Sequence, residues 1–207
     1  AEYSLLPGST DSRFRRERRG AKGRTQEIER LVARSLRAAV DLEELGPIAL
    51  NVDCDILNAD GGTRCASITA ANLALRLGVR RLIASGVCLP QNMRPTEEQR
   101  RSGWNAPVLS KEDQMEHEMR VMPNDVAAIS VGLIDGQAYL DLDYNLDSNA
   151  DVDMNVVKVS NGAFVEVQGT GEESTYQREE LDTLLDMADI GFSSLFEMQK
   201  SILAGQE

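Results

Sequence analysis

The sequence predicts a mixed α/β fold in which helices and sheets pack in layers. Apolar residues recur at helical spacing after residue 25, and from Ile48 they alternate with polar residues at a period of two. Asp-Gly and Asn-Gly pairs separate further alternating stretches in the C-terminal half, as in β-hairpins. The 207 residues are enough for one large domain, and we expect a single domain over 1–207.

The first helix is expected to follow a basic stretch, with Thr25 placed to cap its start and Gly46 to end it. Its apolar face consists of Ile28, Leu31, Val32, Leu36, Ala39 and Val40. The segment after Ile48 predicts a half-buried strand, because one face of the alternation is apolar. The residues on that face are Leu50, Val52, Cys54 and Ile56.

A glycine loop, residues 60–64 (Asp-Gly-Gly-Thr-Arg), leads into an apolar helix that we expect to end near Leu75. Residues 84–124 contain four of the six prolines and many charges. We expect a long connection there, with one short helix near 111–120, and we treat about 76–125 as an insertion. We expect His117, the single histidine, to lie on the surface with its hydrogen bonds satisfied. We expect Trp104, the single tryptophan, to serve packing.

Two hairpins and a helix complete the chain. The first hairpin turns at Asp135-Gly136, between 126–133 and 138–144, and the second at Asn161-Gly162, between 155–159 and 164–167. The last helix is expected from Arg178 to about Leu203, with a break at Gly191.

Charge is distributed unevenly along the chain. The net charge is −12, yet residues 11–24, here called the basic arm, contain seven basic residues against two acids. This asymmetry favours local binding to a phosphate backbone, although a solvated charged loop is an open alternative. The basic residues are Arg13, Arg15, Arg16, Arg18, Arg19, Lys22 and Arg24.

No apolar run approaches the roughly 20 residues that a membrane-spanning helix needs, and no signal peptide is recognisable. Cys54, Cys65 and Cys88 are odd in number and scattered, which suits neither a disulfide framework nor a CxxC zinc site. We therefore expect a protein of the reducing cytoplasm.

Two candidate phosphate-binding sites lie at the starts of predicted helices. The glycine loop brings backbone N–H groups and the positive end of a helix dipole beside Thr63 and Arg64, which favours an anion. A tight turn with Thr63 as the N-cap is the alternative. Arg24, just before the first helix, can offer its planar guanidinium to phosphate, although alone it would be a surface residue.

A third candidate site is an acidic cluster. Crowded carboxylates repel one another unless they share a cation or a proton, so the cluster predicts a Mg²⁺ or Mn²⁺ site or a carboxyl with a raised pKa. The alternative is that Asp141 and Asp143 face solvent while Asp147 and Asp151 cap turns. The five aspartates are Asp141, Asp143, Asp147, Asp151 and Asp153. Together the three sites and the arm indicate an enzyme acting on phosphodiesters.

Five segments resemble, in order, the RNase PH family of phosphate-dependent 3′ to 5′ exoribonucleases, which are nucleotidyltransferases. They are residues 1–10, 23–28, 51–69, 141–155 and 165–170. The resemblance implies the RNase PH variety of the ribosomal-protein-S5-like fold, apparently lacking an N-terminal part that would precede Ala1. Leu146 and Cys65 depart from the family pattern, which has an acid and commonly a threonine there.

The resemblance also implies residue roles. Arg24, Thr63 and Arg64 would bind phosphate, Asp147 and Asp153 would bind metal and assist acid catalysis, and Arg13 and Arg16 would hold the tRNA acceptor end.

The function expected from the resemblance is a cytoplasmic enzyme that trims the 3′ ends of tRNA precursors. It would use inorganic phosphate and Mg²⁺ or Mn²⁺, release nucleoside diphosphates, and assemble as a homo-hexamer, a trimer of dimers. The alternatives are a non-catalytic RNA-binding or scaffold paralogue and a catalytic subunit of an exosome-like ring.

Overall fold

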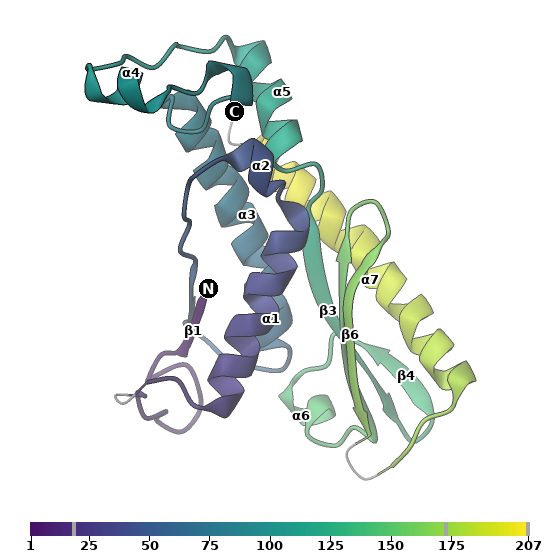
Figure 1. Ribbon diagram of the computed structural model, residues 1–207. Helices are drawn as coiled ribbons and strands as arrows, with labels where there is room; N and C mark the ends of the chain where they lie inside the picture. Colours follow the sequence, from purple (N-terminus) through teal and green to yellow (C-terminus); the bar gives the residue numbers. More distant parts are fainter. Residues whose placement is uncertain (18–19, 172–173, 206–207) are drawn as a thin grey trace.

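The computed structural model describes residues 1–17, 20–171 and 174–205, and it contains two sheets (Figure 1). A small parallel sheet pairs β1 (Glu2–Leu5) with β2 (Asp53–Ile56). A larger antiparallel sheet has the order β4-β3-β5-β6. Its strands are β3 (Val126–Ile134), β4 (Gln137–Leu140), β5 (Val152–Val159) and β6 (Phe164–Gly171). The predicted mixed α/β class is confirmed.

Helices cover both faces of the larger sheet. Helices α1 (Gly23–Ala39) and α3 (Thr63–Ala84) pack in one core with Ala128 and Val157, whereas α7 (Arg178–Ala204) packs in a second core with Ala127 and Val156. Neighbouring residues of one strand thus enter opposite cores. This explains why β3 is a nearly continuous apolar run, because the strand is buried on both faces.

Both predicted hairpins are confirmed. The Asp135-Gly136 turn joins β3 to β4, and both of its residues have positive φ. Strand β4 ends at Leu140, and a one-turn helix, α6 (Tyr144–Asp147), follows it. The Asn161-Gly162 turn joins β5 to β6.

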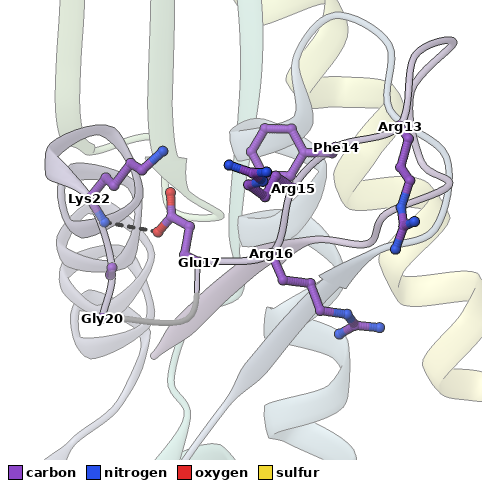
Figure 2. Close-up of a pocket in the computed structure, with 8 residues that line it drawn as sticks. Arg13, Phe14, Arg15, Arg16, Glu17, Gly20 and Lys22 are labelled. Carbon is purple, nitrogen blue, oxygen red and sulfur yellow. Dashed lines mark hydrogen bonds between the residues drawn. The ribbon is translucent and has the colours of Figure 1, made fainter.

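The first helix differs from the prediction at both ends. It begins at Gly23, with Lys22 as its N-cap residue, so Thr25 lies inside the first turn and caps nothing. The Thr25 hydroxyl instead donates to Glu17 Oε1, while the Lys22 backbone N–H donates to Glu17 Oε2 at 2.8 Å (Figure 2). The helix ends at Ala39, and Gly46 ends a separate turn, α2 (Leu42–Leu45), capped by Asp41.

The strand predicted from Ile48 is paired only over Asp53–Ile56, since the four residues of β1 are its partner among the described residues. Leu50 and Val52 still pack against the core, as the alternation predicts. Helix α3 continues well beyond Leu75, to Ala84.

The expected break at Gly191 is wrong, because α7 is continuous from Arg178 to Ala204. A Cβ at Gly191 would lie 2.1 Å from Cδ1 of Ile129 and 3.0 Å from Cδ1 of Leu140. The glycine therefore permits close packing of the helix on β3 and β4 rather than interrupting it.

The segment after α3 contains the expected short helix, α5 (Lys111–Val121), and two elements that the sequence analysis missed: a 3₁₀ turn, η1 (Gln91–Met93), and α4 (Glu97–Arg101). A capping box between Thr96 and Gln99 starts α4. Trp104 packs against the core, as predicted. Among the residues that the structure describes, no helix is long and apolar enough to cross a membrane.

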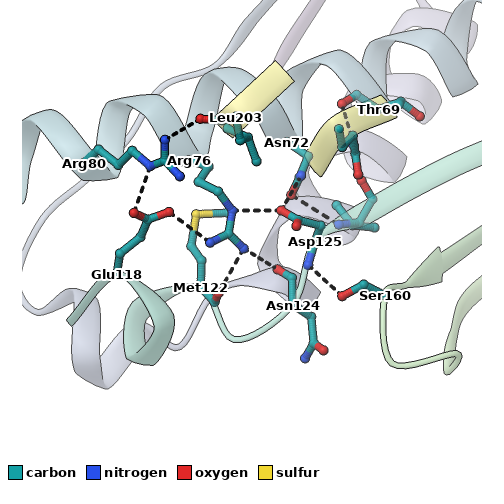
Figure 3. Close-up of polar contacts among 12 residues, drawn as sticks. Thr69, Asn72, Arg76, Arg80, Glu118, Met122, Asn124, Asp125, Ser160 and Leu203 are labelled. Carbon is teal, nitrogen blue, oxygen red and sulfur yellow. Dashed lines mark hydrogen bonds and ion pairs between the residues drawn. The ribbon is translucent and has the colours of Figure 1, made fainter. Parts of the chain in front are cut away.

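A buried ionic network joins α3 to α5 and to the start of β3 (Figure 3). The Arg76 guanidinium donates to Glu118 Oε1 at 3.1 Å, to Asp125 Oδ1 at 2.8 Å and to the Met122 carbonyl at 2.9 Å. Arg80 adds a bond to Glu118 Oε2 at 2.8 Å and another to the Leu203 carbonyl at 3.0 Å. The network fixes the C-terminal half of α3 against α5, the residue before β3 and the end of α7.

His117 is fully buried, so its expected surface position is wrong. Its Nε2 lies 3.6 Å from the Cys88 sulfur, and its Nδ1 lies 3.7 Å from Glu44 Oε2. Burial lowers the pKa of His117, and the nearby charge of Arg120 lowers it further. The imidazole is consequently neutral in the folded protein at pH 7.

Arg76→Ala should lower the free energy of unfolding by about 3 kcal/mol, because it leaves Asp125 and the buried Glu118 without one of their charge partners. Urea unfolding measures the change. The matched control, Arg101→Ala, removes an exposed pair with Glu97 and should cost less than about 0.5 kcal/mol. Equal effects of the two substitutions would contradict a structural role for the network.

His117 should make stability fall as the pH drops below its ordinary pKa of 6.5. The folded-state pKa is the lower one, so the unfolded chain binds the additional proton in this window and is favoured there. Urea unfolding at about pH 7.5 and about pH 5.5 measures the difference. Because His117 is the chain's single histidine, His117→Gln should remove most of it; an unchanged difference would assign the effect to carboxyl groups.

Candidate active site

The glycine loop is docked against the loop between β4 and α6. A Cβ at Gly61 would lie 2.0 Å from the Leu142 carbonyl oxygen and 2.8 Å from the carbonyl carbon of Asp143. Asp60 Oδ1 accepts from the N–H groups of Gly61 (2.9 Å) and Tyr144 (2.7 Å), which ties the two loops together. Glycine is required here because any side chain would strike the backbone of the opposite loop.

The docked loop ends at the start of α3. Gly62 is the N-cap residue, with φ of +66° and no side-chain cap, so the proposed capping role of Thr63 is wrong: Thr63 is the first helical residue. The Thr63 hydroxyl lies 2.8 Å from the hydroxyl of the buried Tyr3 on β1. The first N–H groups of α3 and the positive end of its dipole therefore stand beside Thr63 and Arg64, as the sequence predicts.

Arg64 is held by side chains from two other elements. Its Nη1 donates to Glu27 Oε1 on α1 and to Gln168 Oε1 on β6, both at 3.1 Å. The first turns of α1 and α3 are thus neighbours, with both N-termini at the same end of the molecule (Figure 1). Neither Glu27 nor Gln168 was singled out by local sequence patterns, although both lie in segments that resemble the RNase PH family.

The aspartates gather around the first turn of α3. The thiol of Cys65 is buried and donates to Asn155 Oδ1 at 3.0 Å. Burial is the main reason that its pKa is raised; Arg64 lowers this pKa, while Asp153, Asp141 and Asp147 raise it. The carboxylates of Asp141, Asp147 and Asp153, which lie after β4, in α6 and in β5, are therefore close enough to the Cys65 thiol to raise its pKa.

The remaining aspartates have structural roles. Asp143 Oδ1 accepts from the Leu146 N–H and caps α6, and Asp151 Oδ2 accepts from the Asp135 N–H. The alternative reading thus holds for the exposed Asp141 and Asp143 and for Asp151, which caps a turn, and Asp143 caps a turn as well. Asp147 ends α6 and Asp153 lies on β5, both half-buried.

The acidic cluster offers hard oxygen ligands of the kind that Mg²⁺ binds. Within the described ranges, no group of three or more His, Cys, Asp or Glu side chains is arranged to hold a metal ion. Asp147 and Asp153 remain a candidate pair of Mg²⁺ ligands, because both are close enough to the Cys65 thiol to raise its pKa. Two carboxylates can suffice, since Mg²⁺ usually keeps several waters.

The basic arm lines a cavity of about 960 Å³, with Arg13, Phe14, Arg15 and Arg16 on one side and Gly20 to Lys22 on the other (Figure 2). Arg13, Arg15 and Arg16 are exposed. Arg18 and Arg19 lie outside the described residues. Glu17 anchors the arm to the start of α1 through the Lys22 N–H.

Arg24 lies in the first turn of α1 and is exposed. No acidic residue stands in this turn, so the basic residues Lys22 and Arg24 face the positive end of the helix dipole. The Glu17 carboxylate, which accepts from the Lys22 N–H and the Thr25 hydroxyl, supplies a negative charge at this helix start, and Arg24 stays exposed beside it.

Two family models match separate parts of the chain. The model of the 3′ exoribonuclease family, domain 1, matches residues 1–78, and that of domain 2 matches residues 125–191. A Ribonuclease PH of Synechococcus sp. is 46% identical over 97% of this chain and 69% of its own length. A Ribonuclease PH of Rhodopirellula baltica is 48% identical over 98% of this chain and 73% of its own.

Solved structures support the fold. Rice (Oryza sativa) Rrp46 matches with a TM-score of 0.59 and 11% identity, covering 98% of this chain and 72% of that one. The Archaeoglobus fulgidus exosome with RNA bound to its active site matches with a TM-score of 0.56 and 18% identity, over 90% of this chain and 64% of that one.

Gly61→Ala should lower the free energy of unfolding by roughly 2 kcal/mol or more, because the new methyl group strikes the Leu142 carbonyl. Gly78→Ala is the matched control: it meets open space within α3 and should stabilise by about 0.5–1 kcal/mol. Urea unfolding of both variants measures the contrast. A neutral Gly61→Ala would show that the two loops are not in close contact.

Proposed function

Because the chain belongs to the 3′ exoribonuclease family, that of RNase PH, we propose that it is the phosphorolytic exoribonuclease that trims the 3′ ends of tRNA precursors. Inorganic phosphate is its co-substrate and RNA its substrate. The observation that carries the proposal is the junction of the α3 N-terminus, with Thr63 and Arg64, and the carboxylates around Cys65. Anion-binding groups and acidic groups within one site suit attack of phosphate on a phosphodiester.

In the proposed reaction, inorganic phosphate attacks the phosphorus of the last internucleotide linkage. The α3 amides, Thr63 and Arg64 bind the attacking phosphate, and Arg24 at the start of α1 offsets further negative charge. The new P–O bond forms as the bond to the 3′ oxygen breaks, and a nucleoside diphosphate leaves. Since one phosphate ester linkage is exchanged for a diphosphate linkage, the reaction is readily reversible.

Asp147 and Asp153 serve the leaving group in this proposal. Their carboxylates would hold Mg²⁺ or Mn²⁺ and assist protonation of the departing 3′ oxygen. A divalent cation bound there supplies charge stabilisation to the oxygens of the reacting phosphate. Both carboxylates lie near the Cys65 thiol, whose pKa they raise, and Cys65 follows Arg64 in the first turn of α3.

The basic arm, through Arg13 and Arg16, is proposed to bind the RNA 3′ end, supported by their exposure on the cavity that the arm lines. We further propose one folding unit over residues 1–207, because the bond from Arg76 to Asp125 joins both matched segments. The resemblance to the family supports a homo-hexamer that works in the cytoplasm.

The test is incubation of the purified protein with a tRNA that has extra 3′ nucleotides and with Mg²⁺, with and without inorganic phosphate. Release of nucleoside diphosphates that requires phosphate supports the proposal. Release of monophosphates without phosphate would indicate hydrolysis instead. RNA binding without any release would favour a scaffold role.

Asp153→Asn should lower kcat by about 100-fold or more, because a carboxyl that serves the leaving oxygen is lost. RNA affinity, measured by filter binding, should stay within about twofold of wild type. Asp135→Asn is the matched control and should retain full activity, since Asn is well accepted at its positive φ in the β3–β4 turn. A fully active Asp153→Asn would remove this residue from the mechanism.

The double variant Arg13→Ala/Arg16→Ala should bind RNA more weakly and with a shallower dependence on salt. If both arginines contact phosphates of a single strand, the slope of log K against log salt should fall by about 1.4. Binding titrations over a range of salt concentrations measure it. Arg101→Ala, on α4, should leave the slope unchanged; an unchanged slope in the arm variant would contradict its role.

A further inference from the structure

The guanidinium of Arg64 forms part of a closed triangle of side chains. Arg64 Nη1 donates to Glu27 Oε1 and to Gln168 Oε1, and Gln168 Nε2 donates to Glu27 Oε1, each at 3.1 Å. The three residues come from α3, α1 and β6, which are separated in sequence by 37 and 104 residues. Three elements therefore converge on one nitrogen of one arginine.

The triangle can be satisfied in only one orientation of the Gln168 amide. Turning the amide over would set its NH₂ group against the Arg64 donor and its oxygen against the Glu27 carboxylate. Both contacts would be repulsive, so Glu27 and Arg64 together fix the amide. In return, Gln168 and Glu27 restrict Arg64 from two directions.

The Arg64 side chain is partly accessible to solvent. Glu27 and Gln168 both accept from Nη1 of Arg64. The Arg64 side chain is 21% exposed and that of Glu27 is 40% exposed, so solvent and small anions reach the pair.

Resting on the function proposed above, we propose that Glu27 and Gln168 are positioning residues that fix Arg64 for inorganic phosphate. A free arginine samples many rotamers and loses that freedom when it binds an anion. The triangle restricts Arg64 before phosphate arrives, so less entropy is lost on binding. Neither residue needs to touch the substrate for this effect.

The competing explanation is that Glu27 and Gln168 only connect α1 to β6, and the chain provides a control for it. Arg34 and Glu166 form an ion pair that also joins α1 to β6. Glu166 lies two residues before Gln168 on the same strand. If only the α1–β6 connection mattered, loss of Glu166 would weaken phosphate binding as loss of Glu27 does.

The test measures the Kd of inorganic phosphate by calorimetry, so it does not depend on turnover. Glu27→Ala and Gln168→Ala should each raise this Kd by about tenfold, the usual scale for a hydrogen bond to a charged group. Glu27→Gln retains the acceptor oxygen and should stay within about twofold of wild type. Glu166→Ala should leave the Kd unchanged, and RNA affinity should be constant throughout.

The double variant Glu27→Ala/Gln168→Ala gives the decisive comparison. Because both residues act through Arg64, the double variant should be no more than about twofold worse than either single variant. Multiplied effects, or a Glu27→Gln variant as weak as Glu27→Ala, would overturn the proposal. If Glu27→Ala fails to fold by circular dichroism, Gln168→Ala alone must still show the loss.

The proposed function fails separately. If wild type binds phosphate and the variants behave as expected, yet no nucleoside diphosphate is released from RNA, the positioning roles stand and the phosphorolytic function does not. If wild type does not bind phosphate, the positioning roles are overturned. They are also overturned if Arg64→Ala binds phosphate as tightly as wild type does.

Discussion

The contact between the glycine loop and the β4–α6 loop is the constraint on which the site depends. It brings residues that are distant in sequence within touching distance, because Gly61 has no side chain and Asp60 bonds to the N–H of Tyr144. The start of α3 comes from the first matched segment, and Asp147 and Asp153 come from the second. Neither segment contains the complete candidate site, which lies at their junction.

The sequence predicted those parts of the fold that local geometry decides. The hairpins followed from Asp135-Gly136 and Asn161-Gly162, since Asp135, Gly136 and Gly162 adopt a positive φ that few other residues accept. The errors arose where distant contacts decide. Gly191 permits close packing of α7 on Ile129, and His117 is buried beside Cys88, neither of which leaves a periodic signal.

The residues of the candidate site also divide into those that local sequence predicts and those that only distant contacts bring together. Thr63, Arg64 and the aspartates were predictable, because a glycine loop before a helix and a crowd of carboxylates are visible in a short window. Glu27 and Gln168 were not predictable as a pair, since 141 residues separate them and each alone is an ordinary polar side chain. The sequence also cannot reveal that Tyr3 reaches the Thr63 hydroxyl, because that contact depends on the pairing of β1 with β2.

The length of α3 separates two ends of the molecule that differ in their tolerance of change. Its 22 residues extend over roughly 33 Å, with Thr63 at one end and Ala84 at the other. The segment containing η1 and α4 follows the far end, and the Arg76 network lies between it and Thr63. Insertions and surface changes there can accumulate without altering the first turn of α3, so new partners could be acquired at one end while the chemistry at the other stays constant.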